Sequence, residues 1–254
     1  MGLLAAVLSL AAPHRLAIDT AGLVSLITAD EVETVAFVDK GTASPARPAG
    51  NHQATPLFGL DTEPVVAGDV LEKWTRTRTE INRELDAVSQ CRTSGICSPA
   101  AQRLIDLSAS GAGQDGRAKA GLINRAVDLA ISPASDEAQW GVSDHWSAPF
   151  ETLQSSRGDC EDYAILKYLA LRAAGISEDD VKIVILKNVF PDEDHAAVAA
   201  RVEDEWLILD NRTLTLVRDT DLTRAIPRFV LDQQGARRFV WASRRPRGAT
   251  VSGS

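Results

Sequence analysis

The apolar residues of this chain change their spacing near Gly175, and that change limits the fold more than any other feature of the sequence. Before it, apolar residues recur at a period of about 3.6 residues, which is typical of helices that bury one face. After it, residues 181–186 follow a period of two and predict a strand. A helical half followed by a strand-rich half predicts an α+β fold, in which a helical N-terminal lobe packs on an antiparallel β-sheet lobe.

Three helices are predicted in the first half. The first starts at Val70, the second covers residues 99–108 and the third covers residues 121–131. Residues 136–150 contain two tryptophans but no clear period, so we expect a loop there.

A fourth helix follows this loop. Asp159 is a favourable N-cap residue, residues 160–174 keep helical spacing, and Gly175 suits a left-handed C-cap. Cys160 therefore falls in the first turn of a helix, where unpaired N–H groups and the helix dipole favour negative charge.

Further strands are predicted after residues 181–186. Residues 196–202 and 206–210 form two of them, joined by the polar turn at residues 203–205. Shorter strands are expected near residues 213–217 and 229–231.

The two ends of the chain carry little pattern. We expect a leader and poorly ordered arm over residues 1–50, one domain over residues 57–240 and a basic flexible tail over residues 241–254. Residues 2–12 have the length of a signal-peptide core and are too short to span a bilayer, but no positive residues precede them. The export signal is therefore incomplete, or the start site is misassigned.

Charge and cysteine content narrow the functional classes. The net charge of −8 argues against a nucleic-acid partner, because proteins that bind nucleic acid carry basic stripes. Cys91 and Cys97 flank a Ser-Gly turn and could close a small disulfide loop, which would imply an oxidising compartment. Metal binding by this pair is less favoured, since no other Cys or His is close. Cys160 is then unpaired and a candidate reactive thiol.

A nucleophilic cysteine needs a base, because its thiol titrates near pH ~8.5. His195 opens a predicted strand, and the turn near Glu203 places Asp210 opposite it or nearly so. Cys160, His195 and Asp210 are thus a candidate triad, in which the carboxylate orients the imidazole. The alternative is that His195 is a histidine at a loop edge and Asp210 forms a turn.

Acidic residues surround the candidate nucleophile. Asp159, Glu161 and Asp162 should raise the pKa of the Cys160 thiol, since like charges oppose ionisation. They are ordinary residues for a helix start, or they mark a hard cation such as Ca²⁺, which takes oxygen ligands and would offset the repulsion.

The segment around Cys160 resembles one known family, the bacterial transglutaminase-like cysteine peptidases of the LapG type. The resemblance rests on the run from Gly158 to Ile165 and covers roughly residues 57 to 235. Supporting matches are Lys167-Tyr168, Leu171-Arg172, the preceding Asp144-x-Trp146-x-x-Pro149, His195-Ala196 and Leu209-Asp210-Asn211.

The resemblance implies a papain-like, transglutaminase-like fold with the nucleophile at a helix N-terminus. It implies a triad of Cys160, His195 and Asp210, and a Ca²⁺ site that uses Asp159 and Glu161. It further implies a calcium-dependent endopeptidase of the periplasm, which cleaves a large surface adhesin under the control of an inner-membrane cyclic-di-GMP receptor.

Two other functions stay open at this point. The same triad could transfer an acyl group to an amine, as a transglutaminase does, or the fold could be a catalytically inactive binding module. Trp146 could line the site, although a buried packing role is favoured for it.

Overall fold

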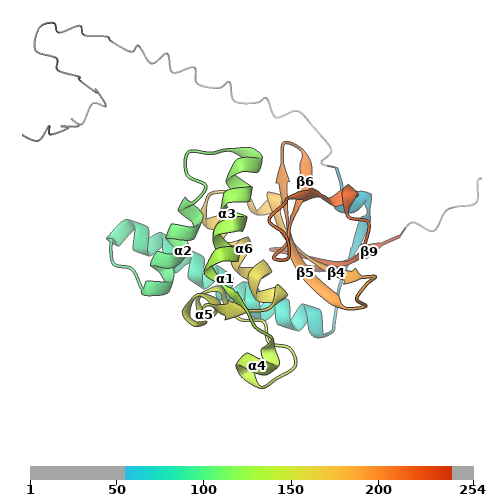
Figure 1. Ribbon diagram of the computed structural model, residues 1–254, viewed down its shortest axis with the longest axis horizontal. Coiled ribbons are helices and arrows are strands. Elements are labelled where there is room, and N and C mark those ends of the chain that lie inside the picture. The colour runs from blue at the N-terminus through green and yellow to red at the C-terminus, as the bar shows by residue number, and fades with distance from the viewer. Residues whose placement is uncertain (1–54, 242–254) are drawn as a thin grey trace, which may run out of the picture. The chain divides into compact units, whose positions relative to one another are not determined.

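The computed structural model describes residues 55–241 (Figure 1). The predicted arm over residues 1–50 lies outside these residues, as does the predicted tail apart from Trp241. The predicted domain over residues 57–240 falls inside them. In this part of the chain, no helix combines the length and the apolar character that a transmembrane span needs.

Helices dominate the first half of the described chain. They are α1 (Asp69–Ser94), α2 (Pro99–Ala109), α3 (Gly116–Ala130), α4 (Asp136–Trp140), α5 (Pro149–Ser155) and α6 (Cys160–Ala173). The strands are β1 (Asp61–Pro64), β2 (Ser132–Pro133), β3 (Arg157–Gly158), β4 (Val181–Asn188), β5 (Asp194–Val202), β6 (Glu205–Leu209), β7 (Val217–Arg218), β8 (Ala225–Asp232) and β9 (Gly235–Val240).

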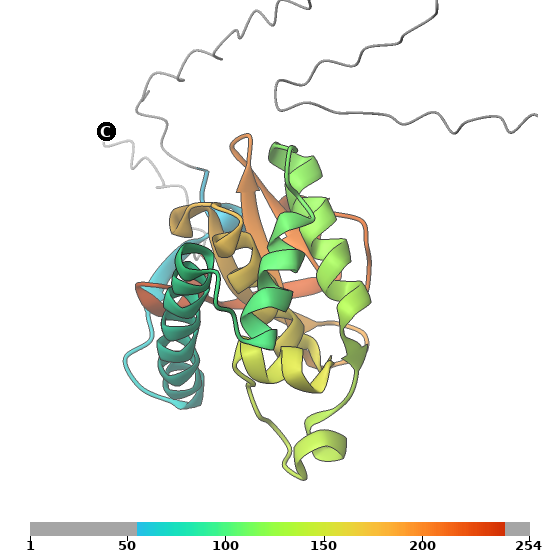
Figure 2. The same cartoon turned by 90° about the vertical axis from the view of Figure 1, so that its left-hand side faces the viewer.

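Seven strands form one antiparallel sheet in the order β1-β9-β8-β4-β5-β6-β7. The sheet curves strongly, and the helices lie together on one side of it (Figure 1). Figure 2 looks from the helical side, with α1, α2 and α3 in front of the strands. The predicted α+β fold is confirmed.

Helix α6 joins the two halves. Most of its side chains are buried, because helices α2, α3 and α5 pack on one side of it and β4 and β5 on the other. On β5, Ala196, Val198 and Ala200 face α6, whereas Ala197 and Ala199 face the opposite core. Small side chains on the α6 side let helix and strand approach closely. The helix start is thereby held against the start of β5.

Trp74 ties α1 to this core. It is fully buried, meets Tyr168 of α6 edge to face at 5.9 Å between ring centroids, and donates from Nε1 to the carbonyl of Asp232 at 2.8 Å. A buried indole needs such a partner, because an unpaired N–H would be costly.

Most predicted elements are found with small shifts at their ends, but the predicted loop over residues 136–150 is wrong. It contains α4 and the start of α5. Ser135 caps α4 by accepting a hydrogen bond from the N–H of Ala138, and Pro149 opens α5. Helices of five and seven residues are too short to produce a visible apolar period.

The sheet also differs from expectation at its edges. The predicted strand over residues 213–217 is reduced to β7, while β1 and β9 were not predicted. Cys91 and Cys97 form a disulfide, with 4.7 Å between their Cα atoms, so the disulfide interpretation of this pair is confirmed.

Candidate active site

Cys160 is the first residue of α6, directly after the short strand β3. The approach to it depends on Gly158, because a Cβ there would lie 2.6 Å from Cβ of Asp162. Asp159 occupies the N-cap position as predicted, but its side chain makes no capping hydrogen bond. Its carboxylate belongs to an acidic cluster beside the helix start, where Oδ1 has no hydrogen-bond partner among the described residues.

The thiol of Cys160 lies between the helix and β5. Sγ is 2.8 Å from Oε2 of Glu161, and the N–H of Ala196 also donates towards it. Burial raises the pKa of this thiol far above its ordinary value, and Glu161 and Asp159 raise it further, while the Ala196 N–H lowers it. The thiol of Cys160 thus contacts the backbone of Ala196, which directly follows His195.

His195 and Asp210 are in contact at the edge of the same region. Nε2 of His195 lies 3.0 Å from Oδ2 of Asp210, and the His195 side chain is almost fully buried. Oδ1 of Asp210 accepts a hydrogen bond from the N–H of Arg212 at 2.8 Å. Burial alone would raise the pKa of Asp210, but the contacts with His195 and Arg212 bring it below its ordinary value.

The remaining nitrogen of His195 has a distinct environment. Nδ1 is buried and has no hydrogen-bond partner among residues 55–241. If Asp210 accepts the proton on Nε2, Nδ1 carries the basic lone pair. The structure therefore brings Cys160, His195 and Asp210 to one end of α6 and leaves one imidazole nitrogen available as a base.

A buried ion pair lies on the same helix. Nζ of Lys167, two turns after Cys160, is 2.7 Å from Oδ1 of Asp128 on α3. Burial lowers the pKa of Lys167 and raises that of Asp128, while the attraction within the pair opposes both shifts. The negative charge of Asp210 raises the pKa of both groups. Asp128 could not be singled out from the sequence, because it lies in a helix with an ordinary amphipathic pattern.

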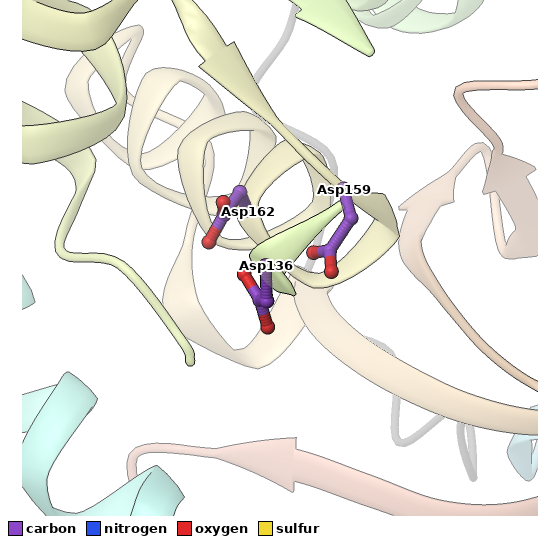
Figure 3. Close-up of side chains that lie close together, drawn as sticks. All are labelled: Asp136, Asp159 and Asp162. Carbon is purple, nitrogen blue, oxygen red and sulfur yellow. The ribbon is translucent and has the colours of Figure 1, made fainter. Parts of the chain in front are cut away.

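Three aspartates converge beside the start of α6 (Figure 3). One carboxylate oxygen from each of Asp136, Asp159 and Asp162 lies within 4.8 Å of the other two. Asp136 accepts from the N–H of His145, and Asp162 accepts from the N–H of Ser147 at 2.9 Å. Oδ1 of Asp159 and Oδ2 of Asp162 are buried and have no hydrogen-bond partner within the described part of the chain.

This acidic cluster is electrostatically unfavourable without a cation. Burial, followed by repulsion from neighbouring carboxylates, raises the pKa of Asp159 to about 8. Burial also raises the pKa of Asp162 to about 7 and that of Asp136 above its ordinary value. A hard cation would relieve the repulsion and use the two unpartnered oxygens. Carboxylate donors suit Ca²⁺ or Mg²⁺ and do not suit a site for a soft metal.

The cluster differs in membership from the metal site predicted from the sequence. Asp159 belongs to it. Glu161 is not one of its three members, although its carboxylate contacts both the Asp159 side chain and Sγ of Cys160. Asp136 was missed, because it is distant in sequence and reaches Asp159 only through the parallel pairing of β2 with β3. Trp146 is buried in the core between the helices and the sheet, as expected of a packing residue.

Comparisons with known proteins show the family of the chain. A family model described as bacterial transglutaminase-like cysteine proteinase matches residues 91–247, more than half of the chain. Calcium-bound LapG from Legionella pneumophila is 20% identical, with 66% of this chain and 92% of that chain covered and a TM-score of 0.49. A second LapG structure from that organism is 20% identical, with 61% and 86% covered and a TM-score of 0.48. No curated protein matches the chain.

Proposed function

The chain belongs to the bacterial transglutaminase-like cysteine proteinases, and from that premise we propose that it is a calcium-dependent cysteine endopeptidase. Cys160 is the nucleophile, His195 the general base and acid, and Asp210 the group that orients the imidazole. The observation that carries this proposal is the 3.0 Å contact between His195 Nε2 and Asp210, on the strand whose next residue, Ala196, donates its N–H towards Cys160.

The chemistry follows from these positions. Nδ1 of His195 accepts the thiol proton as Sγ of Cys160 attacks the carbonyl carbon of a peptide bond. The C–N bond breaks, the imidazolium returns its proton to the leaving amine, and a thioester joins the acyl part of the substrate to Cys160. Water, deprotonated by His195, then hydrolyses the thioester and releases the acid. Asp210 stabilises the imidazolium through both half-reactions.

A calcium ion would be held by the cluster of Asp136, Asp159 and Asp162, with Glu161 as a further candidate ligand. The two buried oxygens without partners support this assignment. When bound, the ion supplies positive charge that offsets the carboxylates beside Cys160. The hydrogen bonds from His145 to Asp136 and from Ser147 to Asp162 hold the preceding loop against the same cluster.

We further propose that the protein acts in the periplasm. The disulfide between Cys91 and Cys97 supports an oxidising compartment, and the apolar run over residues 2–12 is suited to an export signal. Proteinases of this family act on protein substrates, and a large surface adhesin is the substrate that the family resemblance suggests. An inner-membrane cyclic-di-GMP receptor is the corresponding regulatory partner.

Acyl transfer to an amine is the alternative reaction for the same triad. To separate the two, the wild-type protein and Cys160→Ala would be incubated with calcium, a labelled primary amine and the N-terminal region of a candidate adhesin. Cleavage that requires Cys160 supports the endopeptidase. Amine incorporation into an uncleaved substrate contradicts it and indicates a transferase.

A further inference from the structure

A concave site that Cys160 does not line lies between α1, α5 and the loop that precedes α5. Its volume is about 560 Å³, which is within the range of pockets that hold small ligands. One wall comes from α1, and the facing wall comes from residues 145–151. None of the residues that line it belongs to the proposed triad or to the aspartate cluster.

Two buried polar side chains of α1 line this pocket. Glu84 is 4% exposed, and its Oε2 accepts a hydrogen bond from the N–H of Phe150 at 3.0 Å. Thr77 is 1% exposed, and its Oγ1 has no hydrogen-bond partner among the described residues. Buried polar groups without partners are uncommon in folded proteins, so each such group calls for an explanation.

Glu84 has no ion-pair partner among the described residues, because the basic groups nearest to it pair with other carboxylates. Arg83 pairs with Glu80 on α1, and His145 pairs with Glu151 of α5 at 3.3 Å. Within residues 55–241, no lysine, arginine or histidine nitrogen forms an ion pair with Glu84. Burial raises the pKa of Glu84 to about 8, and the charges of Glu80 and Glu151 raise it while that of Arg83 lowers it.

Aromatic side chains complete the lining. Trp146 and Phe150 border the same pocket as Glu84 and Thr77. Aromatic rings attract cations, and a buried carboxylate supplies the opposite charge. The combination of a buried acid without an ion-pair partner, a hydroxyl oxygen without a hydrogen-bond partner and aromatic walls is complementary to a positively charged group with N–H donors.

We propose that this pocket binds a primary ammonium or guanidinium group, such as the end of a lysine or arginine side chain of a bound protein. The cation pairs with Glu84, and Oγ1 of Thr77 accepts one of its N–H groups. This binding does not require Cys160 and goes beyond the proposed endopeptidase activity. The pocket also adjoins the cluster through its wall, since the N–H of His145 donates to Asp136.

Binding should depend on pH in a defined direction. The ligand cation pairs with ionised Glu84, whereas the empty pocket holds Glu84 mostly protonated below pH 8. Binding therefore releases a proton, and affinity rises with pH until Glu84 is ionised without ligand. Between pH 6 and pH 8 the expected gain is at least about tenfold. The other charged side chains that line the pocket with Glu84 are Arg76, Glu80, Arg83, His145 and Glu151.

The test is isothermal titration calorimetry on the full chain in calcium-containing buffer, with Nα-acetyl-arginine methylamide and Nα-acetyl-lysine methylamide as probes. Saturable binding at pH 8 that weakens at least about tenfold at pH 6 is the expected result. Nα-acetyl-norleucine methylamide is a probe of similar length without charge and should not bind. Nα-acetyl-glutamate methylamide tests whether the pocket selects an anion instead.

Glu84→Gln should abolish binding of both basic probes, while its amide oxygen can still accept the Phe150 hydrogen bond. Glu72→Gln makes the same chemical change on the exposed face of α1, outside the pocket, and should bind as the wild type does. Equal binding by Glu84→Gln, selection of the acidic probe, or no saturable binding at pH 8 would each overturn the proposal. None of these outcomes depends on whether Cys160 cleaves peptides.

Discussion

Nε2 of His195 lies 3.0 Å from Oδ2 of Asp210, although the two residues are not directly opposite on their strands. Val198 pairs with Leu209, so continuation of the β5–β6 register places Asp210 across from Ala197, two residues from His195. Residues two apart on a strand share a face, and a diagonal contact is within reach of an imidazole and a carboxylate. The register of this hairpin thus brings the carboxylate of Asp210 within reach of the His195 imidazole.

Asp210→Asn tests this orientation. The variant keeps the size of the side chain but loses the charge that stabilises the imidazolium, so kcat for peptide cleavage should fall by roughly 10²- to 10⁴-fold. The melting temperature should change little, since Asn can still accept the hydrogen bond from the Arg212 N–H. Steady-state kinetics with a peptide substrate measures the loss, and unchanged kcat would remove Asp210 from the triad.

Calcium should stabilise the folded protein through the three aspartates. At a calcium concentration about 100 times the dissociation constant, the gain is about 2.7 kcal/mol, or roughly 5–10 °C in melting temperature. Asp162→Asn should lose this shift, while its amide oxygen can still accept from the Ser147 N–H. Asp136→Asn should lose it as well.

Asp86→Asn is the control for the calcium experiment, because Asp86 is an exposed residue of α1 outside the cluster. It should respond to calcium as the wild type does. A thermal shift of equal size in wild type, Asp162→Asn and Asp136→Asn would place the ion elsewhere.

Stability should decrease with pH because of Glu84. Its pKa is near 4.5 in the unfolded chain and about 8 in the folded one, so the folded state keeps the proton over this interval. The stabilising contribution is complete below about pH 4.5 and is lost as pH rises towards 8, by at most about 1.4 kcal/mol per pH unit. Melting temperatures of the wild type should fall relative to Glu84→Gln between pH 5 and pH 8. Parallel curves for the two proteins would contradict the raised pKa.

The disulfide between Cys91 and Cys97 should contribute modestly to stability. It closes a short loop, for which the chain-entropy estimate is about 2 kcal/mol, or roughly 4–8 °C in melting temperature. The Cys91→Ser/Cys97→Ser double variant should therefore melt lower than the oxidised wild type and become insensitive to dithiothreitol. If reductant lowers both melting curves equally, the disulfide does not account for the effect.

The sequence predicted the elements with strong local signals. Helix α6 has Asp159 at its N-cap position and Gly175, with positive φ, directly after its C-cap residue. Strands β5 and β6 alternate around a turn in which Glu203 and Asp204 have positive φ. Cys160, His195 and Asp210 could be proposed together because these elements determine where each residue lies along the chain, and their role as a triad stays a prediction. Helices and strands could be predicted where capping residues and the spacing of apolar residues mark their ends.

The acidic cluster shows what local pattern could not provide. Asp136 joins Asp159 because Ser132 pairs with Arg157 and Pro133 with Gly158, a parallel pairing between two-residue strands. Strands of this length have no readable alternation. The pairing of β1 with β9, from opposite ends of the described chain, is equally non-local and was missed for the same reason.

The rate at which Cys160 is alkylated tests the central claim most directly. Cys91 and Cys97 are joined in a disulfide, so Cys160 is the one free thiol that iodoacetamide can modify. We expect His195→Ala to slow alkylation at least about tenfold in calcium-containing buffer, because the imidazole promotes the thiolate. His52→Ala, a histidine outside the described residues, should leave the rate unchanged. The rate is measured by mass spectrometry of the Cys160 peptide. Equal rates for the wild type and His195→Ala would contradict a nucleophile activated by His195.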